Sequence, residues 1–353
     1  MANEKCVSLF KRGVVVWNAW RHQNANINPD LSQLISESVR FREGSLSNVN
    51  LTDAILSRSD FCMADLHHAD LRRANLNQSS LYTANLDSSN LEGASFVAAD
   101  LRETLLCGAN LRAANLCGAI LAIANLRRAS LREANLNESD LSHACLANAD
   151  LCMATLIKAR LNYADLREAN LYTANLSQAT LFMATLSHAD LREATLNRAN
   201  LRDADLRQAN LSMTIFCIAN LIGATLYKAN LTRANLSMAN LCMANLSHAN
   251  LRGATLVGAN LIGTNLYDAN LETANLQEAD LREAALTDAN LTEANLQRAD
   301  LSMANLQRAN LRRANLSHAN LHQANLWQAD FTETCLTGAT MPDGSIHSQS
   351  GSS

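Results

Sequence analysis

Large apolar side chains recur at every fifth position of this chain. The register runs from Leu46 to Met341 without an insertion or deletion, which makes 60 consecutive pentapeptides. A period of five matches neither the 3.6-residue period of an α-helix nor the two-residue period of a flat strand. We therefore predict that the chain turns once per pentapeptide, so that leucine returns to the same side, and that four such turns close a square.

A small residue accompanies each leucine. The position two before it is nearly always alanine, as at Ala64 and Ala69, with Ser59, Thr104, Thr214 and Thr264 among the few exceptions. We predict that the leucine and this small residue point inward and fill a narrow, dry interior. The position directly before the leucine is mostly Asn or Asp, and the two after it vary widely, so these three are interpreted as solvent-facing.

Glycine and proline support one turn per repeat. Proline is absent from Leu31 to Met341, as expected where backbone N–H groups bond to neighbouring coils. Eight glycines occupy the second variable position, where a type II turn requires a positive φ. These are Gly93, Gly108, Gly118, Gly223, Gly253, Gly258, Gly263 and Gly338.

The motif A(N/D)LXX resembles that of the pentapeptide-repeat family. It is seen in Ala74-Asn75-Leu76-Asn77-Gln78 and Ala234-Asn235-Leu236-Ser237-Met238, and it covers about 85% of the chain. The resemblance implies an all-β fold, a right-handed quadrilateral β-helix with 20 residues per coil, and hence about 15 coils. Leucine-rich repeats and hexapeptide β-helices have other spacings and do not fit.

The two ends depart from the repeat. Val7, Phe10, Val14 and Trp17 fall at helical spacing, so residues 5–22 are predicted to form an amphipathic helix. Such a helix would cap the exposed edge of the first coil, and a helix for a partner or a membrane surface is the alternative. We assign residues 1–43 to this N-terminal α-helical cap and transition, and residues 44–342 to the β-helix.

The C-terminal boundary follows from Met341-Pro342-Asp343-Gly344, which stops the repeat. Residues 343–353 are rich in serine and are predicted to be a disordered tail. This ending and the stretch Trp17-Asn18-Ala19-Trp20-Arg21 resemble cyanobacterial members of the family.

The charge and the cysteine content limit the partners and the cellular compartment that we expect. The net charge is −4, from 29 basic and 33 acidic residues spread along the chain, so nucleic acid is not an expected partner. We predict neither a signal peptide nor a transmembrane segment. Nine cysteines without a CxxC pair indicate a reducing compartment, and we predict a soluble cytoplasmic protein.

No catalytic, cofactor or metal site is predicted. His68, His188 and His248 share one turn position, but even the last two are three coils, or roughly 14 Å, apart at the spacing of paired strands. That separation is too large for a shared metal ion. A convex rod also lacks a cleft that would desolvate a catalytic carboxylate, so we predict that the protein is not an enzyme.

An apolar band is the candidate interaction surface. When side chains 20 residues apart are aligned, apolar turn residues gather on two adjacent faces, with an interruption at Arg202 and Asp203. The candidate residues are Ile123, Tyr163, Phe182, Met183, Ile218, Ile222, Met238, Met243 and Ile262.

Three functions are considered. The first is a rigid, non-enzymatic scaffold that binds an unknown protein partner, possesses no cofactor, and is a monomer or weak homo-oligomer. The second, implied by some relatives, is a DNA mimic that binds DNA gyrase or topoisomerase, although such a mimic needs a strongly anionic surface. The third is a structural or stress-related protein without a specific partner.

Overall fold

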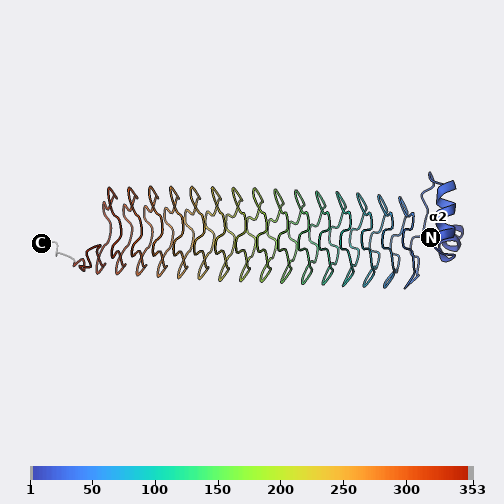
Figure 1. Ribbon diagram of the computed structural model, residues 1–353, viewed down its shortest axis with the longest axis horizontal. Helices are drawn as coiled ribbons and strands as arrows, with labels where there is room; N and C mark the ends of the chain where they lie inside the picture. Colours follow the sequence, from blue (N-terminus) through green and yellow to red (C-terminus); the bar gives the residue numbers. More distant parts are fainter. Residues whose placement is uncertain (1–2, 349–353) are drawn as a thin grey trace. The chain divides into compact units, whose positions relative to one another are not determined.

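A computed structural model describes residues 3–348, which form two compact units. Unit 1 comprises residues 3–179 and unit 2 residues 180–348. Unit 1 starts with two helices, α1 (Glu4–Lys11) and α2 (Val14–Gln23), drawn in blue in Figure 1. The remainder of each unit consists of turns and single β-bridges, so each unit is described by its coils.

Parallel β-bridges join residues that are 20 apart in sequence. In unit 1 they run from Asp30↔Asn50 to Thr155↔Asn175, and in unit 2 from Thr180↔Asn200 to Asn320↔Thr340. Each bridge is one residue long and is flanked by turns, so no longer strand occurs within residues 3–348. Each unit is therefore a parallel β-helix with 20 residues per coil, and the predicted coil length is confirmed.

Within the stacked coils, every backbone N–H of a pentapeptide that begins with Asn or Asp has an acceptor, as residues 50–54 show. In residues 50–54, Leu51 and Asp53 donate to the next coil, and Asn50 donates to the preceding one. Ala54 donates across the turn to the carbonyl oxygen of Leu51, and Thr52 donates to the side chain of Asn50. All five donor–acceptor distances lie between 2.7 and 3.0 Å. A proline at any of these positions would remove one of these bonds, which explains its absence from the repeats.

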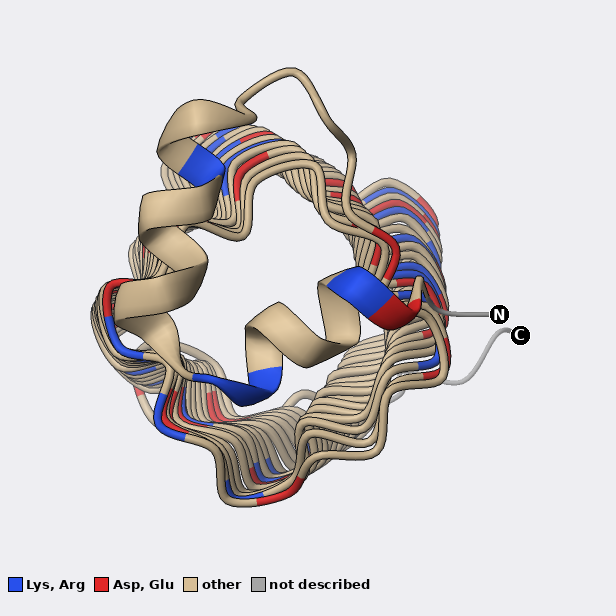
Figure 2. Cartoon of the chain, turned by 90° about the vertical axis from the view of Figure 1, so that its right-hand side faces the viewer, with Lys and Arg blue, Asp and Glu red and all other residues tan. Residues whose placement is uncertain are grey.

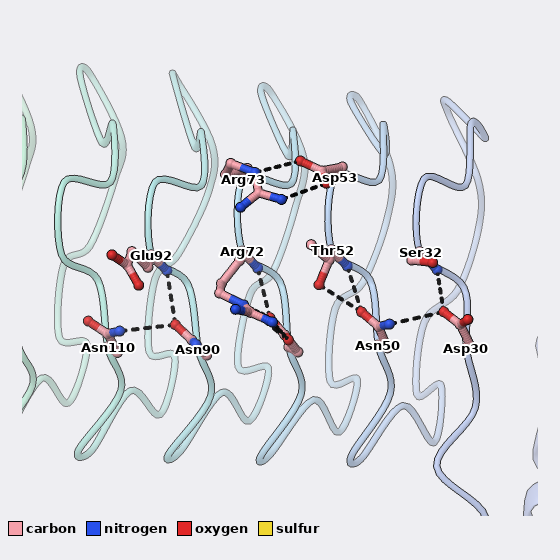
Figure 3. Close-up of polar contacts among 11 residues, drawn as sticks. Asp30, Ser32, Asn50, Thr52, Asp53, Arg72, Arg73, Asn90, Glu92 and Asn110 are labelled. Carbon is pink, nitrogen blue, oxygen red and sulfur yellow. Dashed lines mark hydrogen bonds and ion pairs between the residues drawn. The ribbon is translucent and has the colours of Figure 1, made fainter. Parts of the chain in front are cut away.

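The Asn or Asp before each leucine is a partly exposed capping residue, and its interpretation as solvent-facing did not include the capping role. These side chains are mostly half-buried, and their Oδ1 atoms accept the N–H two residues later. Figure 3 shows this for Asp30, which accepts from Ser32 at 3.0 Å. Neighbouring caps also bond to each other, because Asn50 Nδ2 donates to Asp30 Oδ1 at 3.0 Å. The polar position thus completes the backbone hydrogen bonding.

The second variable residue adopts a positive φ in each repeat, which confirms the predicted turn. The angle is 66° at Gly93, but 58° at Asp53 and 56° at Gln208, so most of these residues are not glycine. This conformation costs a residue with a side chain roughly 1–2 kcal/mol. The inter-coil hydrogen bond from the same residue, such as Asp53 N to Arg72 O at 2.9 Å, offsets that cost.

Leucine and alanine fill the interior, as predicted. Within the stacked coils these side chains are almost fully buried. Threonine can replace alanine at the small position because its hydroxyl donates a hydrogen bond to a backbone carbonyl oxygen. Thr214 Oγ1 donates to Leu191 O at 2.7 Å, and Thr264 Oγ1 donates to Leu241 O at 2.9 Å. The buried hydroxyl is therefore satisfied and costs little.

The N-terminal cap has two helices and not one. The prediction of a continuous helix over residues 5–22 was wrong because the chain breaks at Gly13, whose φ of 93° is incompatible with an α-helix. Figure 2 shows both helices lying across the end of the first coils. The Phe10 ring stacks on Phe41 with centroids 4.1 Å apart, and Trp17 Nε1 donates to Ser45 O at 2.9 Å.

A buried arginine also attaches α2 to the coils. Arg21 is 5% exposed and donates to the carbonyl oxygens of Ile27 and Ser47 at 2.6 and 3.0 Å. Burial lowers the pKa of its guanidinium from the ordinary value. The cation thus bonds to carbonyl groups that would otherwise lack a partner, and it aligns the helix with the first coil.

Both boundaries of the β-helix differ from those predicted. The bridges begin at Asp30 and not at residue 44, and Leu31 and Phe41 are already buried. At the other end, Thr340 pairs in antiparallel fashion with Ile346, so a hairpin occupies the start of the predicted disordered tail. Residues 349–353 of that tail lie outside the described residues.

The capping role predicts the effect of Asn245→Ala. Asn245 Oδ1 accepts the N–H and hydroxyl of the buried Ser247 at 3.0 and 2.7 Å. Its removal should lower the free energy of unfolding by about 1–2 kcal/mol, whereas Asn245→Asp keeps the acceptor and should have a smaller effect. Urea denaturation measures both. Equal midpoints for the alanine variant and wild type would contradict the capping role.

The packing of the cap predicts the effect of Trp17→Ala. The Trp17 side chain is fully buried, so its loss should destabilise the N-terminal cap by about 3–5 kcal/mol. Limited proteolysis should then cleave first within residues 3–45. Val15→Ala is the control, because Val15 is 80% exposed on the same helix and should have little effect.

Candidate functional site

Three consecutive coils of unit 2 carry an uncharged apolar surface, which we call the uncharged window. It comprises the outward side chains of residues 215–223, 235–243 and 255–263, a set without Lys, Arg, His, Asp or Glu. Its apolar members are Ile215, Ile218, Ile222, Met238, Met243, Val257 and Ile262. The 20-residue coil brings these three segments side by side, since Ile215 bridges Asn235 and Asn235 bridges Thr255.

Charged residues border the window in the two flanking coils. The preceding coil contains Arg198, and Arg202 pairs with Asp203 at 3.3 Å. The following coil contains Glu278 and Arg282 at the corresponding positions. The window is therefore a bounded patch in unit 2, and the predicted interruption at Arg202 and Asp203 forms one of its edges.

Two methionines are the most exposed side chains in the window. Met238 is 64% exposed and Met243 is 69% exposed. Each lies over a glycine of the next coil: a Cβ atom at Gly258 would be 2.7 Å from Met238 Sδ, and one at Gly263 would be 2.6 Å from Met243 Sδ. The glycines thus leave room for flexible thioether side chains, which adapt well to a partner surface.

Backbone N–H groups beside the apolar side chains of the window already have partners. Ile222 and Ile262 donate their N–H groups to the side chains of Asn220 and Asn260, at 3.2 and 3.1 Å. The N–H of Met243 donates to the carbonyl oxygen of Ile262 at 2.9 Å. What the window offers a partner is consequently apolar contact.

The structure gathers only part of the predicted band. Ile218, Ile222, Met238, Met243 and Ile262 lie together in the window. The other candidates lie elsewhere: Phe182 and Met183 are separated from the window by the coil of Arg202 and Asp203, and Ile123 and Tyr163 belong to unit 1.

The unit 1 candidates are themselves separated. His143 occupies the coil between Ile123 and Tyr163, and its ring stacks on Tyr163 with centroids 4.8 Å apart. They therefore form no continuous apolar surface. The sequence analysis did not identify Gly258 and Gly263 as contacts of Met238 and Met243. Each glycine follows its methionine by 20 residues, and this spacing could have indicated the contact.

The charged surfaces consist largely of local ion pairs. Asp-Leu-Arg segments place the guanidinium beside the carboxylate of the same repeat, at 2.7 Å for Asp165 with Arg167 and for Asp280 with Arg282. Hydrogen bonds from these arginines lower the pKa of Asp165 and Asp280 below their usual range. The pairing neutralises each carboxylate locally.

The histidines make ordinary surface contacts. His248 Nδ1 lies 2.8 Å from Asp268 Oδ2, and His68 contacts the ring of His67. Across residues 3–348, no group of three His, Cys, Asp or Glu side chains is placed to hold a metal ion. Neither described helix has the length and apolar character needed to cross a membrane.

The repeats of this chain match a known protein family. The model of a family described as "Pentapeptide repeats (8 copies)" matches residues 45–81, 84–122, 124–156, 134–171, 153–187, 184–217, 216–242, 239–277, 274–313 and 309–343. A search of curated proteins finds no match.

Several solved structures are similar in part. HetL, a pentapeptide repeat protein involved in heterocyst differentiation regulation in Nostoc sp. strain PCC 7120, is 40% identical over 60% of this chain and 91% of its own, with a TM-score of 0.34. Rfr23 from Cyanothece 51142 is 39% identical over 26% of this chain and 63% of its own, with a TM-score of 0.25. Full-length QnrB1, a plasmid-mediated fluoroquinolone resistance protein, is 19% identical over 55% of this chain and 94% of its own, with a TM-score of 0.30.

The lowered aspartate pKa values predict acid sensitivity. A carboxylate with a depressed folded-state pKa contributes stability above its unfolded pKa of about 4, and that stability is lost as the pH falls through the folded value. The melting temperature should therefore change little between about pH 7 and pH 5 and fall below about pH 4. Combining Arg167→Gln with Arg282→Gln should weaken this acid-dependent fall, as thermal melts would show. If the melting temperatures of wild type and of the double variant fell equally below about pH 4, the stabilising role of these Asp–Arg pairs would be contradicted.

Proposed function

The chain belongs to the pentapeptide-repeat family, and from this we propose that it is a non-enzymatic scaffold whose uncharged window binds another protein. The single observation behind the proposal is the window in unit 2. It places apolar side chains on three adjacent coils and excludes charge from the same area. Depletion of charge at the centre with charge at the rim is typical of protein interfaces.

Folding alone does not require apolar residues in the window. The position of Met238 is filled by Arg198, Glu278 and Arg298 in other coils of unit 2, and the backbone there is the same. A solvent-exposed methionine gains little stability from its position. A binding role therefore accounts for the apolar residues better than a purely structural one.

The partner that suits this surface is a protein with an apolar centre and a mixed-charge rim. Apolar contact supplies the affinity at the window, and Arg198, Arg202 and Glu278 at its borders orient the partner. DNA mimicry is less well supported, because arginines neutralise carboxylates such as Asp165 and Asp280. A mimic of duplex DNA requires these charges to remain uncompensated.

Introducing charge tests the window. A variant with both Met238→Lys and Met243→Lys should lose at least about tenfold in affinity for proteins captured by the wild-type chain, since two cations would be desolvated in the interface. Affinity purification after crosslinking, followed by titration of the captured protein, measures the loss.

The matched control changes exposed methionines outside the window. Met153→Lys with Met303→Lys adds the same charge at side chains that are 54% and 57% exposed. It should bind like wild type. Equal binding by both double variants would contradict the proposal, and light scattering distinguishes a second copy of the chain from a foreign partner.

A further inference from the structure

One arginine of unit 2 lacks the acid that holds its counterpart in unit 1. Residues 53, 73 and 93 occupy the same position in successive coils, and residues 213, 233 and 253 occupy that position in unit 2. In unit 1, Asp53 receives two hydrogen bonds from Arg73, both at 2.7 Å, as Figure 3 shows. A Cβ atom at Gly93 would lie 3.5 Å from Arg73 Cγ, so the arginine stem passes over the glycine.

Unit 2 keeps the arginine and the glycine but not the acid. A Cβ atom at Gly253 would lie 3.6 Å from Arg233 Cγ, which reproduces the packing of Arg73 on Gly93. Met213 stands where Asp53 stands in unit 1. Within residues 3–348 Arg233 forms no ion pair. The stem of Arg233 thus packs like that of Arg73, while its guanidinium has no carboxylate partner among the described residues.

A hollow of about 400 Å³ lies beside this arginine. Its lining consists of Ser212, Met213, Thr232, Arg233, Arg252, Gly253 and Thr273. A Cβ atom at Gly253 would touch Arg233 Cγ and Thr273 Oγ1 at 3.6 and 3.7 Å, so a side chain there would take up part of this space. The second guanidinium, that of Arg252, is 3.4 Å from Glu272 Oε1, so that pair leaves Arg233 as the uncompensated charge.

The hydrogen-bond donors around the hollow that have no acceptor within residues 3–348 could bind an anion. The hydroxyls of Thr232 and Thr273 donate to Asn230 Oδ1 and Glu272 O, each at 2.6 Å, and the N–H of Gly253 donates to Glu272 O. Unused donors remain on Arg233 and Arg252, and the Ser212 hydroxyl adds one. Guanidinium groups bind phosphate and carboxylate oxygens through parallel hydrogen bonds.

We propose that this hollow binds a phosphoryl group, whose oxygens bond to Arg233 as the Asp53 carboxylate bonds to Arg73. A phosphate monoester offers three acceptor oxygens and nearly two negative charges, which suits two guanidiniums and a hydroxyl better than a single carboxylate does. The site shares coils with the uncharged window, but none of the residues that line the hollow belongs to the window. The phosphoryl group can be free phosphate or part of a phosphorylated side chain.

Binding is measured by 31P NMR, from the relaxation of inorganic phosphate and of O-phosphoserine on addition of the full chain at constant ionic strength. Met213→Asp should lower the affinity about tenfold while keeping both arginines, because the new carboxylate occupies Arg233. Arg233→Gln should have a similar effect. Met303→Asp and Arg298→Gln add or remove the same charges elsewhere in unit 2 and should stay within about twofold of wild type.

The reciprocal variant tests the comparison between the units. Asp53→Met frees Arg73 over Gly93 and should increase phosphate binding in unit 1. Preference for O-phosphoserine over inorganic phosphate would identify a phosphorylated side chain as the ligand, and the opposite preference would identify free phosphate. The proposal is overturned if wild type binds neither probe at about 10 mM, or if Met213→Asp binds like Met303→Asp with both variants folded by circular dichroism.

Discussion

The structure depends on the use of every backbone N–H group within the pentapeptides that begin with Asn or Asp. Two donate to the next coil, one to the preceding coil, one across the turn and one to the Asn or Asp cap, as in residues 50–54. This pattern requires a positive φ once per repeat and tolerates neither proline nor a change of register. The strict period of five is therefore a requirement of hydrogen bonding as much as of leucine packing.

Because the backbone is nearly invariant, differences among coils lie in the outward side chains. Met238 over Gly258 exposes a thioether, whereas the same position holds Arg198 one coil before the window. Replacement of an acid by Met213 leaves Arg233 without a partner. Each of the two proposed surfaces thus arises from a few substitutions on a common frame, without an inserted loop.

The sequence was sufficient for the parts of the fold that repeat. Leucine and alanine identified the interior, and glycines such as Gly93 revealed a turn that Asp53 adopts without being glycine. The sequence did not predict the first coil, because Ser36 interrupts the apolar pattern there. It predicted one continuous N-terminal helix, because the apolar spacing continues across Gly13. The cap and the candidate sites depend on contacts between distant residues, including Arg21 with Ser47, which no local pattern specifies.

Residue-resolved amide hydrogen exchange is the most direct test of the common frame. Met243 is a decisive residue, because its side chain is 69% exposed while its N–H donates to Ile262 at 2.9 Å. The neighbouring Cys242 N–H donates to Asn240 Oδ1 at 3.2 Å. Both amides should exchange slowly, within about tenfold of the buried Leu241 amide. Exchange of Met243 and Cys242 at the rate of an unfolded peptide, with Leu241 still protected, would contradict a backbone that is fully hydrogen-bonded at its exposed turns.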